Sequence, residues 1–378
     1  MTTPREKGNL NLQNPACGVY YESLTIVYLL FFYIIMKFAI GYQEPENGES
    51  FVDIVRDYQA HLAEVFFPWI GSASCRSSLG KKRGAIDWDM QQVLEMDLRE
   101  IRRLGIKLDL LFNANCYGDR AISISLENEV LSIVSHLADL ELLPDIITTT
   151  SPFIARTVKK HCPKIEVRAS VNMRIGSSIQ MDYLSDLFDS FYVQRDIQRD
   201  LPAVRQLKQW CDEHHKGLLM LVNSGCLRNC PSQIFHDNMV AHDSGIDEQK
   251  NVSDWTAHLC WRIFGQDHRY EEFLRETWIR PEDLELYEDI FPVVKLATRQ
   301  HSHPRMVIGA YVNRSFSGNL LNLLEPGHAT AFLPYIIDNR KFPPSWRTTA
   351  TDCAANCKHC GKCAEVLQQV LVKTESKN

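Results

Sequence analysis

Residues 217–230 read GLLMLVNSGCLRNC, an apolar run that ends in a polar turn and two cysteines. The run has the near-continuous hydrophobicity of a strand buried on both faces, as strands of parallel sheets are. Similar runs recur along the chain, and each has the length of a strand. They lie at 37–42, 63–69, 107–113, 144–150, 165–171, 190–196 and 291–297. With 217–223 they make eight predicted strands.

Helical patterns separate most of these runs. Five segments have apolar residues at helical spacing and begin at a capping residue or a proline, as helices commonly do. They lie at 50–62, 87–105, 125–140, 151–162 and 200–215. Eight strands that alternate with helices predict an α/β fold, a (β/α)₈ TIM-like barrel. A doubly wound open sheet is the alternative, but the sequence has no glycine-rich phosphate fingerprint, which favours the barrel.

The composition is that of an ordinary globular protein. The chain has 378 residues, of which 45% are hydrophobic and 23% charged, and this argues against disorder. The net charge of −6 gives no global basic field that would attract a polyanion. The one dense basic stretch, GKKRG at 80–84, is typical of a solvated loop. Nucleic acid binding is therefore not supported by charge.

An apolar run, LTIVYLLFFYII, lies near the N-terminus at 24–35. A membrane-spanning helix needs about 20 such residues, so this run is too short to span. Glu22 precedes it and no small-x-small cleavage site follows, which disfavours a signal peptide. Met36 reads as a start residue before the first strand. We expect residues 1–35 to be an extension outside the fold, no stable membrane span and a cytoplasmic location; a membrane-anchored or packed tail is the alternative.

Four of the twelve cysteines lie close together near the C-terminus, in DCAANCKHCGKC at 352–363. They are Cys353, Cys357, Cys360 and Cys363. Such compact spacing lets one loop supply all four thiolates of an iron–sulfur cluster. Structural zinc more often takes two separated pairs, and it remains the alternative, as do plain structural cysteines. We expect a barrel over 36–324 and a small cysteine-rich extension over 325–378.

A second cysteine group lies in the unusually long connection between the last two strands. Cys226 and Cys230 directly follow the strand at 217–223, and Cys260 lies farther along the same connection. Cys75 follows the strand at 63–69 and is expected at the same barrel face. These four thiols are predicted to converge on one metal group at the barrel mouth. The alternative is that Cys75 and Cys260 are buried small hydrophobic residues.

Several segments together resemble the collagenase-like peptidase family of unassigned catalytic type. They are VNMRIGSSIQMDYLSDLFDSFYVQRDIQRDLPAV, NSGCLRNCPSQIFH, HLCWR and FPVVKLATR, and the resemblance covers roughly residues 36–315 in order. Members include proteins of oxygen-independent ubiquinone biosynthesis and of RNA base hydroxylation. They bind a 4Fe–4S cluster through four cysteines, and some use prephenate as oxygen donor. The C-terminal cysteines are not part of the common family core.

The resemblance implies an iron–sulfur enzyme that carries out redox group transfer, such as oxygen-independent hydroxylation of an aromatic or RNA substrate. It implies one 4Fe–4S cluster at Cys75, Cys226, Cys230 and Cys260, and the C-terminal cysteines would hold a second. Arg195 and Lys295 match charged positions of the family, and with Arg299 they are expected to bind a carboxylate, which arginine pairs with bidentately.

His236 lies beside the cysteine pair and is a candidate proton shuttle, because imidazole titrates near neutrality; a surface or capping histidine is the alternative. The expected partners are a small carboxylated or aromatic substrate, an electron-donor protein and a homologous partner subunit. A zinc-stabilised binding or assembly module and a peptidase are the alternative functions. No Ser/His/Asp order or HExxH zinc helix in the sequence supports proteolysis.

Overall fold

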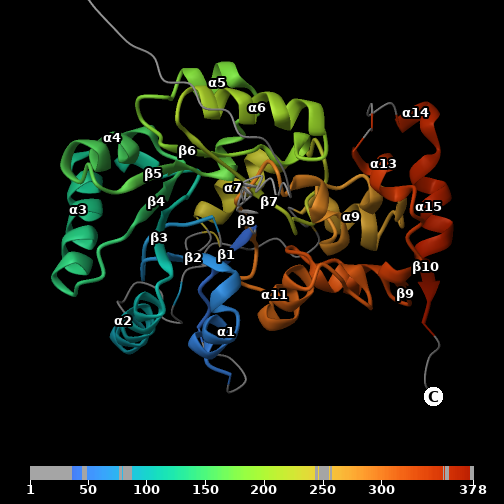
Figure 1. The fold of residues 1–378 in the computed structure, drawn as a ribbon, viewed down its shortest axis with the longest axis horizontal. Helices are drawn as coiled ribbons and strands as arrows, with labels where there is room; N and C mark the ends of the chain where they lie inside the picture. Colours follow the sequence, from blue (N-terminus) through green and yellow to red (C-terminus); the bar gives the residue numbers. More distant parts are fainter. Residues whose placement is uncertain are drawn as a thin grey trace, which may run out of the picture. The chain divides into compact units, whose positions relative to one another are not determined.

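Eight parallel strands close into a barrel, so the predicted (β/α)₈ TIM barrel is confirmed (Figure 1). Neighbours in sequence are neighbours in the barrel, and β8 closes it by pairing with β1, where Ala39 lies opposite Lys295. The strands are β1 Lys37–Gly41, β2 Leu62–Pro68, β3 Lys107–Phe112, β4 Ile146–Thr149, β5 Glu166–Ala169, β6 Ser190–Tyr192, β7 Gly217–Leu221 and β8 Val293–Leu296.

The computed structural model describes residues 36–374 apart from 45–48, 76–78, 80–86, 243–245, 247–254, 256–257, 352 and 354–356. The described residues all belong to one compact unit, Ile35–Asn378. The apolar run at 24–35 and the basic stretch at 80–84 lie outside the described residues. Within the described part, no helix has the length and apolar character needed to cross a membrane. The cytoplasmic location and the boundary between residues 324 and 325 stay predictions.

Three helices between the strands begin at the capping residue where the sequence predicts a helix start. Asp87, Ser151 and Asp200 each accept a hydrogen bond from the backbone N–H three residues on, which satisfies a free donor of the first turn. The third helix begins slightly earlier than predicted, because Ser123 rather than a later serine caps it. The helices up to β7 are α1 Phe51–Asp57, α2 Trp88–Arg103, α3 Ile124–Asp139, α4 Pro152–His161, α5 Ser178–Asp182 and α6 Leu201–Glu213.

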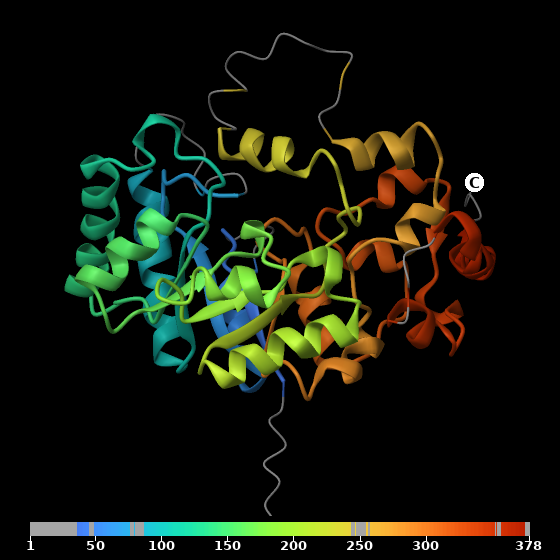
Figure 2. The same cartoon turned by 90° about the horizontal axis from the view of Figure 1, so that it is seen from above.

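The long connection between β7 and β8 carries α7 Gln233–Ala241, α9 Leu259–Gly265 and α10 Glu271–Leu274. In Figure 2, α7 and α9, yellow to orange, lie along one side of the barrel. After β8 come α11 Pro304–Val312, α12 Ala329–Phe332, α13 Trp346–Thr351, α14 Cys357–Cys360 and α15 Lys362–Val370. The two-stranded sheet of β9 Tyr335–Ile337 and β10 Leu371–Lys373 joins the end of the chain to the segment after α12.

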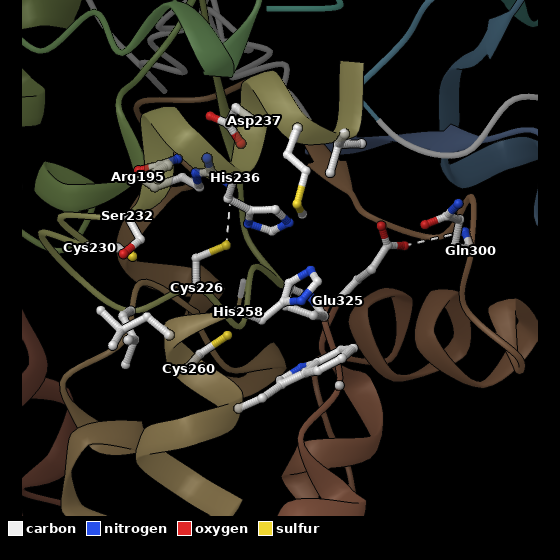
Figure 3. A pocket seen from close by; sticks show the side chains of 18 residues that line it. Arg195, Cys226, Cys230, Ser232, His236, Asp237, His258, Cys260, Gln300 and Glu325 are labelled. Carbon is white, nitrogen blue, oxygen red and sulfur yellow. Dashed lines mark hydrogen bonds between the residues drawn. The ribbon is translucent and has the colours of Figure 1, made fainter. Parts of the chain in front are cut away.

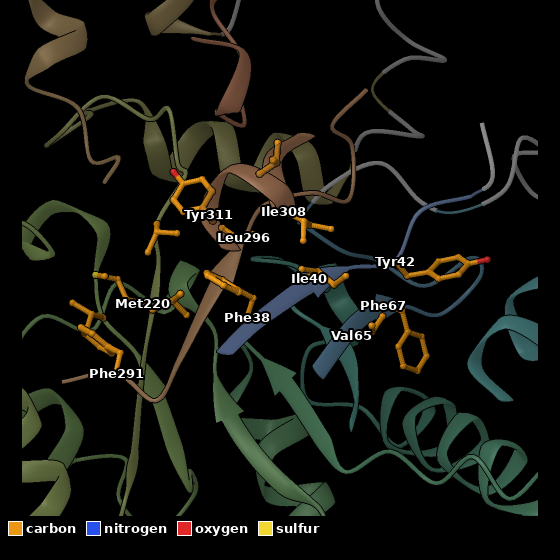
Figure 4. Close-up of a cluster of buried hydrophobic side chains, with 14 of the residues drawn as sticks. Phe38, Ile40, Tyr42, Val65, Phe67, Met220, Phe291, Leu296, Ile308 and Tyr311 are labelled. Atoms are coloured by element: carbon orange, nitrogen blue, oxygen red, sulfur yellow. The ribbon is translucent and has the colours of Figure 1, made fainter. Parts of the chain in front are cut away.

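The main apolar core lies between the barrel and its helices (Figure 4). Side chains alternate across each strand, so Phe38 and Ile40 face outward into this core together with Val65 and Phe67. The tail joins the same core, because Trp346 is fully buried and stacks on Trp278 with ring centroids 5.6 Å apart.

The inside of the barrel holds a cluster of buried charges beside apolar side chains such as Leu111 and Leu219, and the sequence did not predict these charges. Arg168 on β5 donates to Glu64 on β2, to Glu166 at 2.9 Å and to the hydroxyl of Ser190 at 3.0 Å. Its guanidinium lies 3.9 Å from Asp109 on β3, which also accepts a hydrogen bond from Thr148 at 2.9 Å. The strands are buried on both faces, as the sequence predicts, but some of the buried side chains on the inner face are charged.

We predict that Arg168→Met destabilises the fold by about 3–5 kcal/mol, because it leaves the buried Glu64 carboxylate without its cation. Arg205→Met is the matched control, since Arg205 pairs with Asp289 on the surface, where both side chains are more than half exposed. That pair is expected to contribute about 1 kcal/mol or less. Urea unfolding of both variants checks the prediction, and equal losses would contradict it.

We also predict a pH-dependent effect of Asp109→Asn. Burial raises the pKa of Asp109 to about 7, although Arg168 acts in the opposite direction. The folded state therefore holds this proton more tightly than the unfolded chain does. The resulting stabilisation is complete below the unfolded pKa and is lost as pH rises through the folded pKa. Relative to wild type, the variant should gain free energy of unfolding between about pH 4 and about pH 7, the interval between the unfolded and folded pKa values; a constant difference would contradict this.

Candidate metal centre at the barrel mouth

Three of the four cysteines predicted to converge at the barrel mouth line one cavity of about 430 Å³ (Figure 3). Cys226 and Cys230 come from the loop after β7, and Cys260 comes from α9. Among the described residues these thiols are not disulfide-bonded. The cavity therefore brings together sulfur atoms from two separate parts of the long connection.

The position of Cys226 is fixed by a close backbone contact on one side of its loop. Gly225 packs so tightly on the chain at Pro326 that a Cβ on it would lie 2.4 Å from the Pro326 carbonyl oxygen. The N–H of Gly225 donates to the carbonyl of Glu325 at 3.3 Å, and the buried imidazole of His328 lies 2.8 Å from the carbonyl of Gly225 through its Nε2. Only glycine fits at this position.

Asp196 and Arg195 hold the same loop from the other side. The Asp196 carboxylate accepts a hydrogen bond from the backbone N–H of Asn229 at 2.7 Å, and its carbonyl accepts one from Arg228 at 2.8 Å. Asn229 has a positive φ of 56°, a conformation that asparagine tolerates better than most residues. Arg195 donates to the sulfur of Cys226 at 3.3 Å. The adjacent residues Arg195 and Asp196 thus position both cysteines.

The thiols of the cavity are partly desolvated and close enough to act on one another. Burial raises the pKa of Cys260 to about 12, and the Cys226 sulfur adds to the shift. Burial also raises the pKa of Cys230, which the backbone of Ser232 opposes. A thiolate here needs a compensating positive charge, such as a metal group, because charge in a desolvated site is costly.

A buried carboxyl group lies behind this cavity, and sequence reasoning did not find it. Glu276 has no exposed surface, and its side chain lies 3.5 Å from the Nε2 of His328. Burial raises the pKa of Glu276 well above its usual range, and the Cys226 sulfur acts in the same direction. No sequence motif marks this pair, because its members lie far apart along the chain.

The fourth predicted cysteine, Cys75, lies in an adjoining cavity of about 50 Å³. Its sulfur accepts a hydrogen bond from the side chain of Asn113 at 3.1 Å. Arg195 and Glu325 line both cavities, so the two cavities share a wall. Lys295 and Arg299 also line the small cavity, beside Asn172. The cations predicted to bind a carboxylate are thus close together, whereas Cys75 is separate from the other three cysteines.

The three thiols of the large cavity, Cys226, Cys230 and Cys260, are the type of ligand that an iron–sulfur cluster takes. Within the described ranges, no three or more His, Cys, Asp and Glu side chains form a group that could hold a metal ion. A cluster of several iron atoms keeps its thiolates farther apart than one ion does, and cysteine thiolates are its usual ligands. Three thiols around one cavity, with a guanidinium N–H on one sulfur, have that chemistry.

The predicted proton shuttle His236 lines the large cavity together with His258, which the sequence analysis did not select. The His236 and His258 rings meet edge to face at 4.6 Å, and His258 stacks on Trp261 at 4.3 Å. The only sequence signal for His258 was its position two residues before Cys260. An aromatic rim therefore lies next to the thiols.

The C-terminal cysteines lie in the tail, at one edge of the fold in Figure 1. Cys353 and Cys363 are half-buried and Cys360 is exposed, whereas the side chain of Cys357 lies outside the described part of the structure. Arg199 links this region to the barrel, since it donates to the carbonyls of Glu276 at 2.6 Å and Ala350 at 3.3 Å.

Comparisons with known proteins find one curated relative and several solved structures that are similar to this chain at low sequence identity. No family model matches the chain. The chain is 24% identical over 280 residues to the uncharacterized protease MJ1657 of Methanocaldococcus jannaschii. The aligned region covers 71% of this chain and 79% of the relative. A solved structure, the U32 peptidase Mk0906, matches with a TM-score of 0.48 and 14% identity over 69% of this chain and 92% of that chain. The chain is thus similar over most of its length to an archaeal protein that is named a protease. An α-amylase from Lactobacillus plantarum matches with a TM-score of 0.34 and 11% identity, over 51% of this chain and 63% of that chain.

We predict that Gly225→Ala destabilises the fold by about 1–3 kcal/mol, because the new Cβ overpacks the contact with Pro326. Gly265→Ala is the control, since a Cβ there meets its nearest neighbour, the Cβ of Ala331, at an ordinary 3.8 Å. Denaturant unfolding of the two variants checks the prediction. A Gly225→Ala protein as stable as the control would show that this contact does not constrain the loop.

Proposed function

We propose that this U32-like chain is an iron–sulfur protein that carries out redox group transfer, with a 4Fe–4S cluster at the barrel mouth. The reaction class that fits best is oxygen-independent hydroxylation of an aromatic or RNA substrate, as the family resemblance implies. The observation that carries the proposal is the common cavity of Cys226, Cys230 and Cys260. Iron–sulfur clusters are bound by cysteine thiolates, and here thiols from two elements line one cavity.

The residues around the thiols support a redox role. Arg195 donates to the sulfur of Cys226, and hydrogen bonds to cluster sulfurs are one way in which proteins tune the reduction potential. A cluster bound here would supply one-electron chemistry beside the aromatic rim of His258 and Trp261. Cys75 remains the predicted fourth ligand, and its location in the adjoining cavity makes it the least supported of the four.

The cationic residues of the small cavity are suited to orient a carboxylated substrate. Arg195, Lys295 and Arg299 line the cavity and are all largely buried, where their attraction to a carboxylate is screened little by water. His236, on the wall of the larger cavity, is the candidate to move a proton to or from an acceptor bound there. The two cavities would thus receive two different molecules.

The tail cysteines are proposed to hold a second cluster that passes electrons from an electron-donor protein. Burial lowers the pKa of the Arg199 guanidinium. The Cys353 and Cys363 sulfurs act in the opposite direction and raise it. Arg199 in turn contacts the backbone of Glu276, beside the mouth cavity. The tail would therefore be connected to the mouth through one buried residue. Zinc at the tail, with the barrel as a binding or assembly scaffold together with a homologous subunit, is the alternative.

Proteolysis is a second candidate function, favoured by the protease name of the archaeal relative. Casein cleavage by metal-free and by iron-loaded protein distinguishes it from the redox proposal. Cleavage that is unaffected by metal removal and by Cys226→Ala would support a peptidase.

We predict that anaerobically purified protein contains iron and acid-labile sulfide, and that Cys226→Ala and Cys357→Ala each lose about half of both, because each removes a ligand of a different cluster. Cys162→Ala is the control, since Cys162 lies at the end of α4 and lines neither cavity. Cys75→Ala decides the fourth ligand by the same assay. Wild-type protein with no iron and no sulfide would end the redox proposal, and zinc in their place would support the alternative.

A further inference from the structure

Lys295 has an unusual environment for a lysine ammonium group. Its residue is 8% exposed and lines the small cavity from β8. Among the described residues no hydrogen-bond acceptor is found for its Nζ, which lies 3.7 Å from the centre of the Phe66 ring and 5.1 Å from that of Tyr192. A buried ammonium normally pairs with a carboxylate or several carbonyls, so this group is left available to a ligand.

The same cavity contains the groups that would bind a carboxylate next to that nitrogen. Arg195 is 7% exposed, and its Nη2 has no hydrogen-bond partner in the described part of the chain. Arg299 reaches the cavity while donating to the hydroxyl of Ser74 at 2.9 Å. Two guanidinium groups thus lie on the wall of the cavity that Lys295 enters, and guanidinium pairs well with carboxylates.

The size of the cavity limits the ligand. One water molecule needs about 10–15 Å³ of cavity volume. The cavity of about 50 Å³ therefore holds a ligand of only a few heavy atoms. An aromatic acid is too large, whereas a two- or three-carbon acid fits. The aromatic rim of the larger cavity lies on the far side of Arg195 and Glu325.

Burial also affects the reactivity of the lysine. Desolvation lowers the pKa of Lys295, and the Asp109 carboxyl opposes this. A desolvated lysine near other cations is more often unprotonated, and an unprotonated amine is a nucleophile toward carbonyl carbons. The lysine, the guanidinium groups and the small volume together define a carbonyl acid as the ligand.

We propose that Lys295 forms a Schiff base with a small 2-oxo acid whose carboxylate binds between Arg195 and Arg299. This activity does not depend on the metal centre proposed above. In the reaction the Lys295 nitrogen attacks the carbonyl carbon, and a C–N bond forms as the C=O electron pair moves to oxygen. The carbinolamine oxygen takes up protons and leaves as water while the nitrogen lone pair makes C=N. Amine and ketone thus give imine and water, with no oxidant or reductant.

Asp109 is the positioning residue of this site. It lies below the cavity, inside the barrel, and its Oδ1 has no hydrogen-bond partner among the described residues. The charged and titratable groups around it are Arg168 on β5, Glu64 on β2, Lys295 on β8 and Tyr192 on β6. The Asp109 carboxyl attracts the ammonium group from inside the barrel and can accept its proton before attack.

Borohydride trapping tests the proposal. The full chain, with and without reconstituted metal, is incubated with pyruvate and sodium cyanoborohydride, digested and mapped by mass spectrometry. We expect one reduced pyruvate adduct on the peptide that contains Lys295. Lys216 is the internal control, because its ammonium donates to the carbonyls of Ser185 and Phe188 at 2.6 and 2.8 Å. Lactate, which has a hydroxyl in place of the ketone of pyruvate, should give no adduct.

Two variants sharpen the test. Lys295→Arg keeps the cation but not the nucleophile and should abolish the adduct. Arg299→Gln should raise the half-saturating pyruvate concentration by about tenfold, because a charge-assisted contact to the carboxylate is lost. Mapping of the wild type alone overturns the proposal if saturating pyruvate labels surface lysines and not Lys295, so the test stands even if a variant fails to fold. Iron content has no bearing on either outcome.

Discussion

The pair of adjacent residues Arg195 and Asp196 is the constraint on which the candidate site depends. They begin a short helical turn directly after β6, so the rigid barrel sets their position. One side chain reaches the sulfur of Cys226, and the other accepts the backbone N–H of Asn229. Hydrogen bonds that involve a charged group contribute about 1.5–3 kcal/mol each, enough to keep a long loop in one conformation. The chain thereby directs two thiols into one cavity before any ligand is present.

The charged interior of the barrel is the second determinant of the site. TIM barrels usually fill this space with branched apolar side chains. Here Arg168, Glu64 and Asp109 take part of this space beside apolar side chains, and the charge cluster extends upward to Lys295. Burying charges costs desolvation free energy, so this cluster does not favour folding as an apolar interior would. We infer that it sets the electrostatics of the cavity above it. The loop cysteines and the barrel interior thus meet at two adjoining cavities that share Arg195.

Much of the fold followed from the sequence, because strands buried by helices carry an apolar pattern that local reading detects. All eight strands lie within the predicted runs or within a residue of them. The interior charges were missed because one charged residue inside an apolar run, such as Asp109 in KLDLLF, does not change the run's overall character. Cys226, Cys230 and Cys260 were found because they cluster in one long connection. The separate location of Cys75, and the pairing of Glu276 with His328, depend on how distant loops pack, and no local pattern encodes this.

The central claim is that iron lies in the cavity bordered by Cys226, Cys230 and Cys260. The most direct measurement is anomalous diffraction at the iron absorption edge from crystals grown anaerobically. The account predicts a strong iron peak within that cavity, next to the sulfur that Arg195 contacts. Iron peaks confined to the C-terminal cysteines, with density for free thiols at the barrel mouth, would contradict it.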